Sequence, residues 1–291
     1  MEVERSLSPM WVRVFEEMTV IVVDVAWLNS RAEQSRAAGR GQTMKLFDAH
    51  CHLQDPRIFD KAPQLIAAAV DSGVVRFAVN GVSEKDWHLV KQISESYPCV
   101  IPCFGLHPWY VAERTPNWLN TLKQFFEATP SAAVGEIGLD KGSQGKKVDF
   151  TDQVNVFRQQ LELAKELKRP ASIHCVRAFG SAEMVPEFAN LGAYFSFSGF
   201  LMSMKVHKAK RMLKMVPSER ILLETDAPDA LPKSELDSAH LVEGASLPEE
   251  LQSIEISSAP FAGARDVLTF PKEALNHPQN IHKFLRPLFK P

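Results

Sequence analysis

Three side chains that can bind a metal or move a proton alternate along one short stretch, as Asp48, His50 and His52 in DAHCHL. Successive side chains of an extended strand point to opposite faces, so residues two apart share a face. The two imidazoles can therefore reach one metal ion, because histidine nitrogens and carboxylate oxygens are common ligands of divalent metals. A His-x-His pair also occurs at the ends of ordinary strands, so the interpretation depends on the rest of the chain.

Further ionisable residues end other apolar stretches. Glu136 lies in GEIGLD, His174 ends PASIH, and Asp226 ends ILLETD. In a parallel α/β barrel the carboxyl ends of the strands meet at one mouth, where active sites lie. A buried carboxylate or imidazole is costly there unless it is paired or bound to a metal. We therefore expect one or two divalent ions to be held by His50, His52, Glu136, His174 and Asp226.

The elements that would position these residues are strands alternating with helices. Continuous apolar runs of this length suit strands that are buried on both faces of a parallel sheet. Seven such runs are expected to be strands: residues 45–53, 74–81, 98–108, 132–140, 170–176, 193–200 and 220–228. Helical patterns lie between them at 62–73, 86–97, 115–128 and 149–169. Repeated βα units predict an α/β fold, either a (β/α) barrel or a doubly wound sheet.

Composition excludes several classes of protein. The 291 residues carry 33 basic and 35 acidic side chains, a net charge of -2, which excludes a strongly basic, whole-surface nucleic-acid binder. No apolar run reaches the roughly 18 residues of a membrane span, so no membrane partner is expected. Four cysteines within apolar runs are too few for a disulfide scaffold and predict a reducing, cytoplasmic compartment. The sequence indicates no obligate protein partner.

The first 43 residues differ in character from the rest of the chain. Their apolar run, MTVIVVDVAWL, is interrupted by Asp24 and preceded by two glutamates, which is unlike a signal peptide. Residues 31–42 have the composition of a linker. We expect residues 1–43 to be a disordered or loosely helical extension. Residues 44–291 would form the barrel domain, with a loop-rich C-terminal part at 230–291.

The motifs, taken in order, resemble those of the TatD-related deoxyribonucleases, which are metal-dependent hydrolases on a TIM-barrel scaffold. The matching motifs are DAHCHL, GLHP, GEIGLD, SIHCVRA, SFSG and ETD, and NHPQNI near the end matches weakly. The ordered set is specific, although each motif alone is not. The resemblance implies two divalent ions, which would be Mg²⁺, Mn²⁺ or Zn²⁺, and DNA as the substrate.

The resemblance also implies a role for each site residue. His50 and His52 would bind the first metal, His174 the second, and Glu136 would bridge the two. Asp226 would complete the first site, so that Glu136 and Asp226 form the catalytic pair.

Two more residues are candidates for substrate binding. Arg177 could neutralise a phosphate oxygen, although it follows His174 by three positions where the family usually has two. His107, in GLHP, could contact substrate from beside the metals.

The spacing also departs from the family. Asp226 follows His174 by 52 residues, whereas three βα steps of about 30 residues each would need roughly 75–90. The family has a further metal-binding histidine on the sixth strand, and this chain has no histidine between His174 and His207. The pattern predicts a splice-altered, incomplete barrel of seven strands that lacks the sixth strand and the C-terminal helices. Its second metal site would be one ligand short, and its activity impaired.

Two other functions stay open. An amidohydrolase that cleaves C–N bonds also places His-x-His on its first strand, but it commonly bridges its metals with a carboxylated lysine where this chain offers Glu136. A chain that folds only in part could bind metal without catalysing a reaction.

Overall fold

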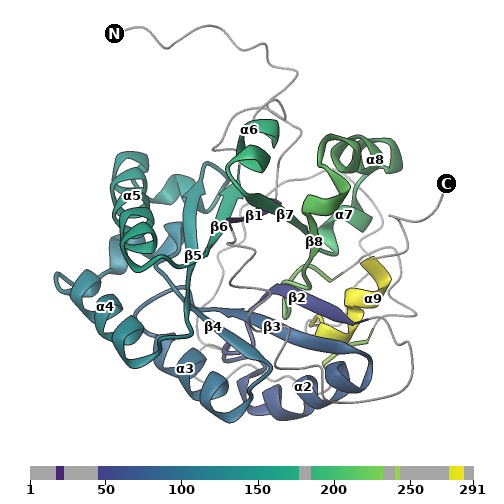
Figure 1. Ribbon diagram of the computed structural model, residues 1–291, viewed down its shortest axis with the longest axis horizontal. Coiled ribbons are helices and arrows are strands. Elements are labelled where there is room, and N and C mark those ends of the chain that lie inside the picture. The colour runs from purple at the N-terminus through teal and green to yellow at the C-terminus, as the bar shows by residue number, and fades with distance from the viewer. Residues whose placement is uncertain (1–17, 23–44, 177–184, 232–239, 243–274, 285–291) are drawn as a thin grey trace, which may run out of the picture.

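The computed structural model describes residues 18–22, 45–176, 185–231, 240–242 and 275–284. Its strands form a nearly closed ring with helices packed around the outside (Figure 1). All seven predicted strands are present and run parallel to one another. They are β2 (Leu46–Cys51), β3 (Val74–Asn80), β4 (Val100–Phe104), β5 (Ala133–Asp140), β6 (Ala171–Val176), β7 (Ala193–Phe197) and β8 (Ile221–Leu223). The prediction of a TIM-barrel-like α/β fold is therefore confirmed.

The helices follow the predicted pattern. The α-helices are α2 (Ala62–Asp71), α3 (Trp87–Ser96), α4 (Trp118–Ala128), α5 (Phe150–Leu167), α6 (Val185–Asn190), α7 (Phe200–Ser203), α8 (Val206–Met215) and α9 (Ile281–Phe284). Short 3-10 helices are η2 (Phe59–Lys61), η3 (Pro108–Glu113), η4 (Gly145–Lys147), η6 (Ser218–Arg220) and η9 (Pro278–Asn280). The longest helix, α5, is capped at its N-terminus by Asp149, whose carboxylate accepts a hydrogen bond from the Asp152 amide at 2.8 Å.

The main core lies between the strands and the surrounding helices. Its largest fully buried side chains include Phe77, Phe104 and Ile137 from the sheet and Trp87 and Leu122 from the helices. Burying apolar side chains of this size stabilises a fold by roughly 1.5–3 kcal/mol each. This packing fixes the strands, and with them the polar residues at their carboxyl ends.

The two ends of the sheet meet beside β2. The Asp226 amide donates to the His50 carbonyl at 2.9 Å, and the His52 amide donates to the Ala227 carbonyl at 2.7 Å. The segment that follows β8 is thereby held against the histidine-bearing end of β2.

The gap in the barrel is filled by the N-terminal segment. Strand β1 (Met18–Val22) lies between β6 and β7 and pairs antiparallel with both (Figure 1). Thr19 is opposite His174 on one side and Ser196 on the other. The sheet of the described residues thus has eight strands, with β1 in the position where a sixth parallel strand would lie.

This strand corrects the expectation for residues 1–43. A disordered or loosely helical extension is wrong for Met18–Val22, and the other residues of that segment lie outside the described ranges. The physical reason is that a missing strand leaves two edges with unpaired backbone groups, and a run of β-branched residues suits the space between them.

Other predictions concern the termini and the cysteines. Of residues 230–291, the structure describes 230–231, 240–242 and 275–284, which include η9 and α9; the rest of the expected loop-rich part lies outside. In the described ranges, no helix is both long and apolar enough to cross a membrane. All four cysteines are free thiols.

Candidate metal centre

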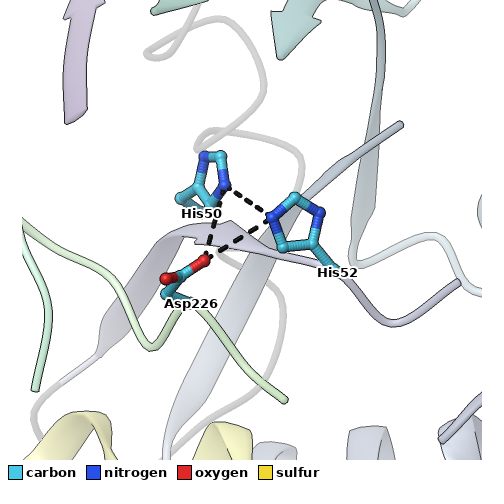
Figure 2. A group of neighbouring side chains, drawn as sticks. All are labelled: His50, His52 and Asp226. Carbon is cyan, nitrogen blue, oxygen red and sulfur yellow. Dashed lines mark hydrogen bonds and ion pairs between the residues drawn. The ribbon is translucent and has the colours of Figure 1, made fainter. Parts of the chain in front are cut away.

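The first group of ligands comes from β2 and from the segment after β8. His50, His52 and Asp226 point toward one another (Figure 2). Their nearest atoms are His50 Nε2 and His52 Nε2, 3.0 Å apart, with Asp226 Oδ1 at 3.8 and 3.5 Å from them. Glu136 Oε2 lies 3.4 Å from His50 Nε2 and 3.6 Å from His52 Nε2. One oxygen of Glu136 thus lies beside the same two imidazole nitrogens that Asp226 approaches.

These separations suit a metal ion. An ion bound tetrahedrally with bonds of about 2.0–2.1 Å has ligand atoms about 3.3–3.4 Å apart. The distances in this group, from 3.0 to 3.8 Å, bracket that value. Two imidazoles and two carboxylates also form a donor set that divalent metals accept.

The opposite edge of each imidazole is also held. His52 Nδ1 donates to the Asn80 carbonyl at 2.8 Å, which leaves Nε2 as the metal-facing atom. His50 Nδ1 lies 3.3 Å from the hydroxyl of Ser172, a buried residue of β6. Metal-binding histidines are usually oriented by such a contact on the second ring nitrogen.

A second group uses the other oxygen of Glu136. His174 Nδ1 lies 3.0 Å from Glu136 Oε1, and His107 Nε2 lies 3.7 Å from the same oxygen. His107, Glu136 and His174 offer ligand atoms within 4.8 Å of one another. The carboxylate of Glu136 thus faces one group with each of its two oxygens.

His174 is oriented by a carboxylate. Its Nε2 lies 3.3 Å from Asp140 Oδ2, which also accepts a hydrogen bond from the Trp109 indole N–H. Asp140 is at the end of β5, on the same face as Glu136, because the two are four residues apart along a strand. His174 therefore has its Nδ1 directed at Glu136 and the second group.

The tautomer of His107 places a proton on the ring nitrogen that faces the second group. Its Nδ1 accepts a hydrogen bond from the Trp109 backbone amide at 3.2 Å, so in the neutral ring Nε2 carries the proton. Burial lowers the pKa of His107 to about 3, against the opposing charge of Glu136, so the ring is neutral at ordinary pH. In this arrangement His107 turns its Nε2 proton toward the second group, 3.7 Å from Glu136 Oε1, and it becomes a ligand only if the Trp109 contact is broken.

The bridging carboxylate stays ionised. Burial by itself would raise the pKa of Glu136, but the charge of His50 and hydrogen bonds from His174 and His50 hold this pKa well below its usual value. An ionised carboxylate with both oxygens available is the form that a bridging ligand needs.

Two of the imidazoles are basic in the absence of a metal. Burial would lower the pKa of His52, but hydrogen bonding to Asp226 and the charge of Glu136 raise it to about 10. Burial would likewise lower the pKa of His174, and hydrogen bonds to Asp140 and Glu136 raise it to about 9. A metal would take the place of these protons, because only the neutral imidazole binds it.

Buried amides of α5 fix the loops that carry the second group. The Gln160 side chain accepts from the Leu106 amide at 2.7 Å and donates to the Leu106 carbonyl at 3.1 Å, next to His107. Gln153 accepts from the Asp140 amide at 2.9 Å. Between β5 and β6 the approach is so close that a Cβ on Gly138, at φ +150°, would lie 2.0 Å from the His174 carbonyl oxygen.

Asp48 fixes the backbone next to Asp226. Its carboxylate, fully buried, accepts from the Thr225 amide at 2.8 Å and from the Thr225 hydroxyl at 2.6 Å. Asn276, from the NHPQNI motif, donates to the Thr225 carbonyl at 2.8 Å. The residue before Asp226 is therefore fixed on both sides.

The structure brings together six of the seven site residues that the sequence singles out. They are His50, His52, His107, Glu136, His174 and Asp226. The seventh, Arg177, lies outside the described residues. The sequence predicted no role for Asp140 or Trp109, and it placed Asp48 on the face of His50 and His52 without giving it a place among the ligands. The two-residue period that links Glu136 to Asp140 could have indicated the first of these.

An α/β barrel with this cluster of imidazoles and carboxylates at its mouth defines a metal-dependent hydrolase. The family model described as "TatD related DNase" matches residues 47–181 and 179–286. The chain belongs to this family. Its two matched stretches meet at the place where the sequence predicts the missing strand.

Relatives in the family align with about two thirds of this chain. A Bacillus subtilis protein, "Uncharacterized metal-dependent hydrolase YabD", is 29% identical over 64% of this chain and 82% of its own length. The human "Deoxyribonuclease TATDN3" is 27% identical over 69% of this chain and 83% of its own length. The Pantoea "3'-5' ssDNA/RNA exonuclease TatD" is 26% identical over 65% of this chain and 81% of its own length. The crystal structure of YJJV, a TatD homologue of Escherichia coli K12, superposes with a TM-score of 0.63 at 23% identity, covering 84% of this chain and 91% of that one.

Proposed function

We propose that this chain hydrolyses phosphodiester bonds of nucleic acid, with DNA as the substrate. The observation that carries the proposal is the position of Glu136, whose two oxygens face two separate groups of ligand atoms. Two-metal hydrolysis of phosphodiesters needs such a shared ligand. The names of the human and Pantoea relatives, a deoxyribonuclease and a DNA/RNA exonuclease, support the same chemistry.

His50, His52 and Asp226, with Glu136, would hold the first ion, and Glu136 with His174 the second. Bound divalent ions supply an acidified water as the nucleophile and stabilise the leaving oxygen. Mg²⁺, Mn²⁺ and Zn²⁺ are all compatible with this donor set. The second group has one firm imidazole, because the His107 tautomer directs a proton toward it, so we propose that the second ion binds more weakly than the first.

Asp226 and His107 would act on the substrate side. The Asp226 side chain keeps 35% of its surface exposed, while Glu136 keeps 5%, so Asp226 can both bind metal and orient a water from the open side. The N–H of His107 can donate to a phosphate oxygen. Arg177, three residues after His174, would neutralise phosphate charge.

The test is cleavage of labelled single-stranded and duplex DNA by the full chain, with EDTA or with each ion added. We expect cleavage only with an ion present, and a loss of at least about 100-fold in Glu136→Gln, since changes to residues that merely orient ligands already cost 10–100-fold. Glu162→Gln, at an exposed glutamate of α5, is the matched control and should retain activity.

Two results would replace the proposal. Metal binding by calorimetry without cleavage of DNA or RNA would make the chain a non-catalytic metal-binding variant. Hydrolysis of a cyclic amide, abolished by the same Glu136→Gln, would make it an amidohydrolase.

A further inference from the structure

Trp109 is an exposed aromatic side chain beside the second group. It retains 43% of its surface, and it is the one aromatic among the exposed large hydrophobic residues of the described ranges. Its ring centroid lies 4.8 Å from that of His107 and 6.0 Å from that of His174. A single exposed apolar residue is ordinary on a protein surface. What needs an explanation is the position of Trp109 beside two histidines of the metal centre.

The indole is held in place by the site itself. Its Nε1–H donates to Asp140, the carboxylate that also orients His174. An anchored indole offers a large flat surface with little loss of conformational entropy on binding.

A loop rich in lysine lies next to this indole. The sequence from 141 to 147, KGSQGKK, contains three lysines and no acidic residue. It ends in η4, which packs against η3, the element that carries Trp109. All three lysines are exposed, and the ammonium of Lys141 lies 4.3 Å from the centre of the Phe150 ring.

We propose that Trp109, Lys146 and Lys147 form a binding site for a single-stranded end of the nucleic-acid substrate. One unpaired base stacks on the indole, and the two lysines contact the phosphates that continue from it. Aromatic side chains next to basic residues are the usual means of binding single strands, because each base has a flat face. Inside a duplex both faces of each base are covered by neighbouring base pairs, so this site favours unpaired bases.

This inference rests on the proposed function and adds to it the residues that would bind a single-stranded end of the substrate. The position of the indole, between the metal ligands and the lysine loop, places the stacked base within a nucleotide of the reacting phosphate. An end-directed nuclease needs such a contact, since the contact holds the terminal nucleotide while the neighbouring bond is cleaved.

The first experiment couples the indole to a base. Binding of the full chain to a phosphorothioate oligonucleotide of about ten nucleotides, within the size of known single-strand sites, is measured by fluorescence anisotropy. A series of oligonucleotides replaces each base in turn by an abasic sugar. We expect Trp109→Ala to weaken binding by about 5- to 150-fold, the range for one stacked base.

The abasic series separates stacking from a structural role. At one position near the end, the abasic change should weaken binding to the wild type and have no further effect in Trp109→Ala. Trp109→Phe, which keeps an aromatic ring but loses the hydrogen bond to Asp140, should retain most of that dependence. If the abasic change costs the same in wild type and Trp109→Ala at every position, no base stacks on Trp109 and the inference fails.

The second experiment tests the lysines by salt dependence. Each phosphate contact to a single strand contributes a slope of about 0.7 in log affinity against log salt. Lys146→Gln with Lys147→Gln should therefore reduce the slope by about 1.4. The control pair, Lys45→Gln with Lys165→Gln, changes exposed lysines at the opposite end of the barrel and should leave the slope unchanged.

The outcomes distinguish this site from the proposed function. Cleavage that continues equally on duplex and single-stranded ends, with unchanged salt slopes in the lysine pair, would overturn the binding site and leave the nuclease intact. No binding or cleavage of any nucleic acid by the wild type would overturn both.

Discussion

Replacing Val20 with proline tests whether β1 closes the barrel. Val20 is the central residue of β1 and lies opposite Ile173 of β6 and Phe195 of β7. Proline has no N–H to donate and is excluded from strands paired on both sides, so Val20→Pro leaves a backbone carbonyl of a neighbouring strand without its donor. An unsatisfied buried group costs about 1–3 kcal/mol. For a chain of this size, each kcal/mol lowers the melting temperature by about 2–4 °C, so we expect a decrease of about 2–12 °C.

The assay is thermal unfolding of the full chain, followed by circular dichroism in EDTA. Val20→Ile, which retains the N–H and the branched Cβ, is the control and should melt within about 0.5 kcal/mol of wild type. A peptide that contains residues 18–22 should restore part of the stability to a chain that begins at Met44, because it offers the same strand to the same two edges. Equal melting temperatures for Val20→Pro and Val20→Ile would show that β1 contributes nothing to the folded state, and the strand-replacement argument would be withdrawn.

Three further predictions concern the metal centre and the gap. Without metal, the melting temperature should fall as pH rises from about 6.5 to 10. Folding raises the pKa of His52 to about 10 and that of His174 to about 9, so their contribution to stability is complete below the ordinary histidine pKa and is lost as the pH rises through the folded-state pKa values. A melting temperature that rises over this range, measured by calorimetry in EDTA, would contradict the prediction. Asp140→Asn should weaken binding at the second group by about 10–100-fold and leave the first unchanged, measured by Mn²⁺ titration with Asp71→Asn, at an exposed residue of α2, as control. Inserting roughly 25 residues after Gly180, about one βα step, should raise DNA cleavage and remove the effect of Val20→Pro on the melting temperature. Equal cleavage by the chains with and without the insertion would mean that the second ion is dispensable.

The sequence was sufficient to predict the seven parallel strands and the cluster at their carboxyl ends. Period two along β2 put His50 and His52 on one face, and barrel geometry required Glu136, His174 and Asp226 to converge with them. These inferences use local pattern and a general property of parallel barrels, so they needed no knowledge of distant contacts.

The parts that escaped prediction depend on contacts between distant segments. Met18–Val22 has strand composition, but its partners are strand edges far along the chain, in β6 and β7, exposed only because a strand is missing there. The tautomer of His107 is likewise set by the backbone amide of Trp109, which no side-chain pattern reveals.

The two halves of the centre depend on different parts of the chain, and this sets the order in which they should fail. The first group is held by β2 and the segment after β8, through two backbone hydrogen bonds and the contacts of Asp48 with Thr225. The second group depends on His174 of β6, a strand whose neighbours are β5 on one side and β1 on the other. Loss of β1 removes one of the two supports of β6 and none of the backbone bonds that hold the first group. A chain without β1 should therefore lose its second ion while it still binds the first, and loss of both ions together would show that the barrel closes or opens as one unit.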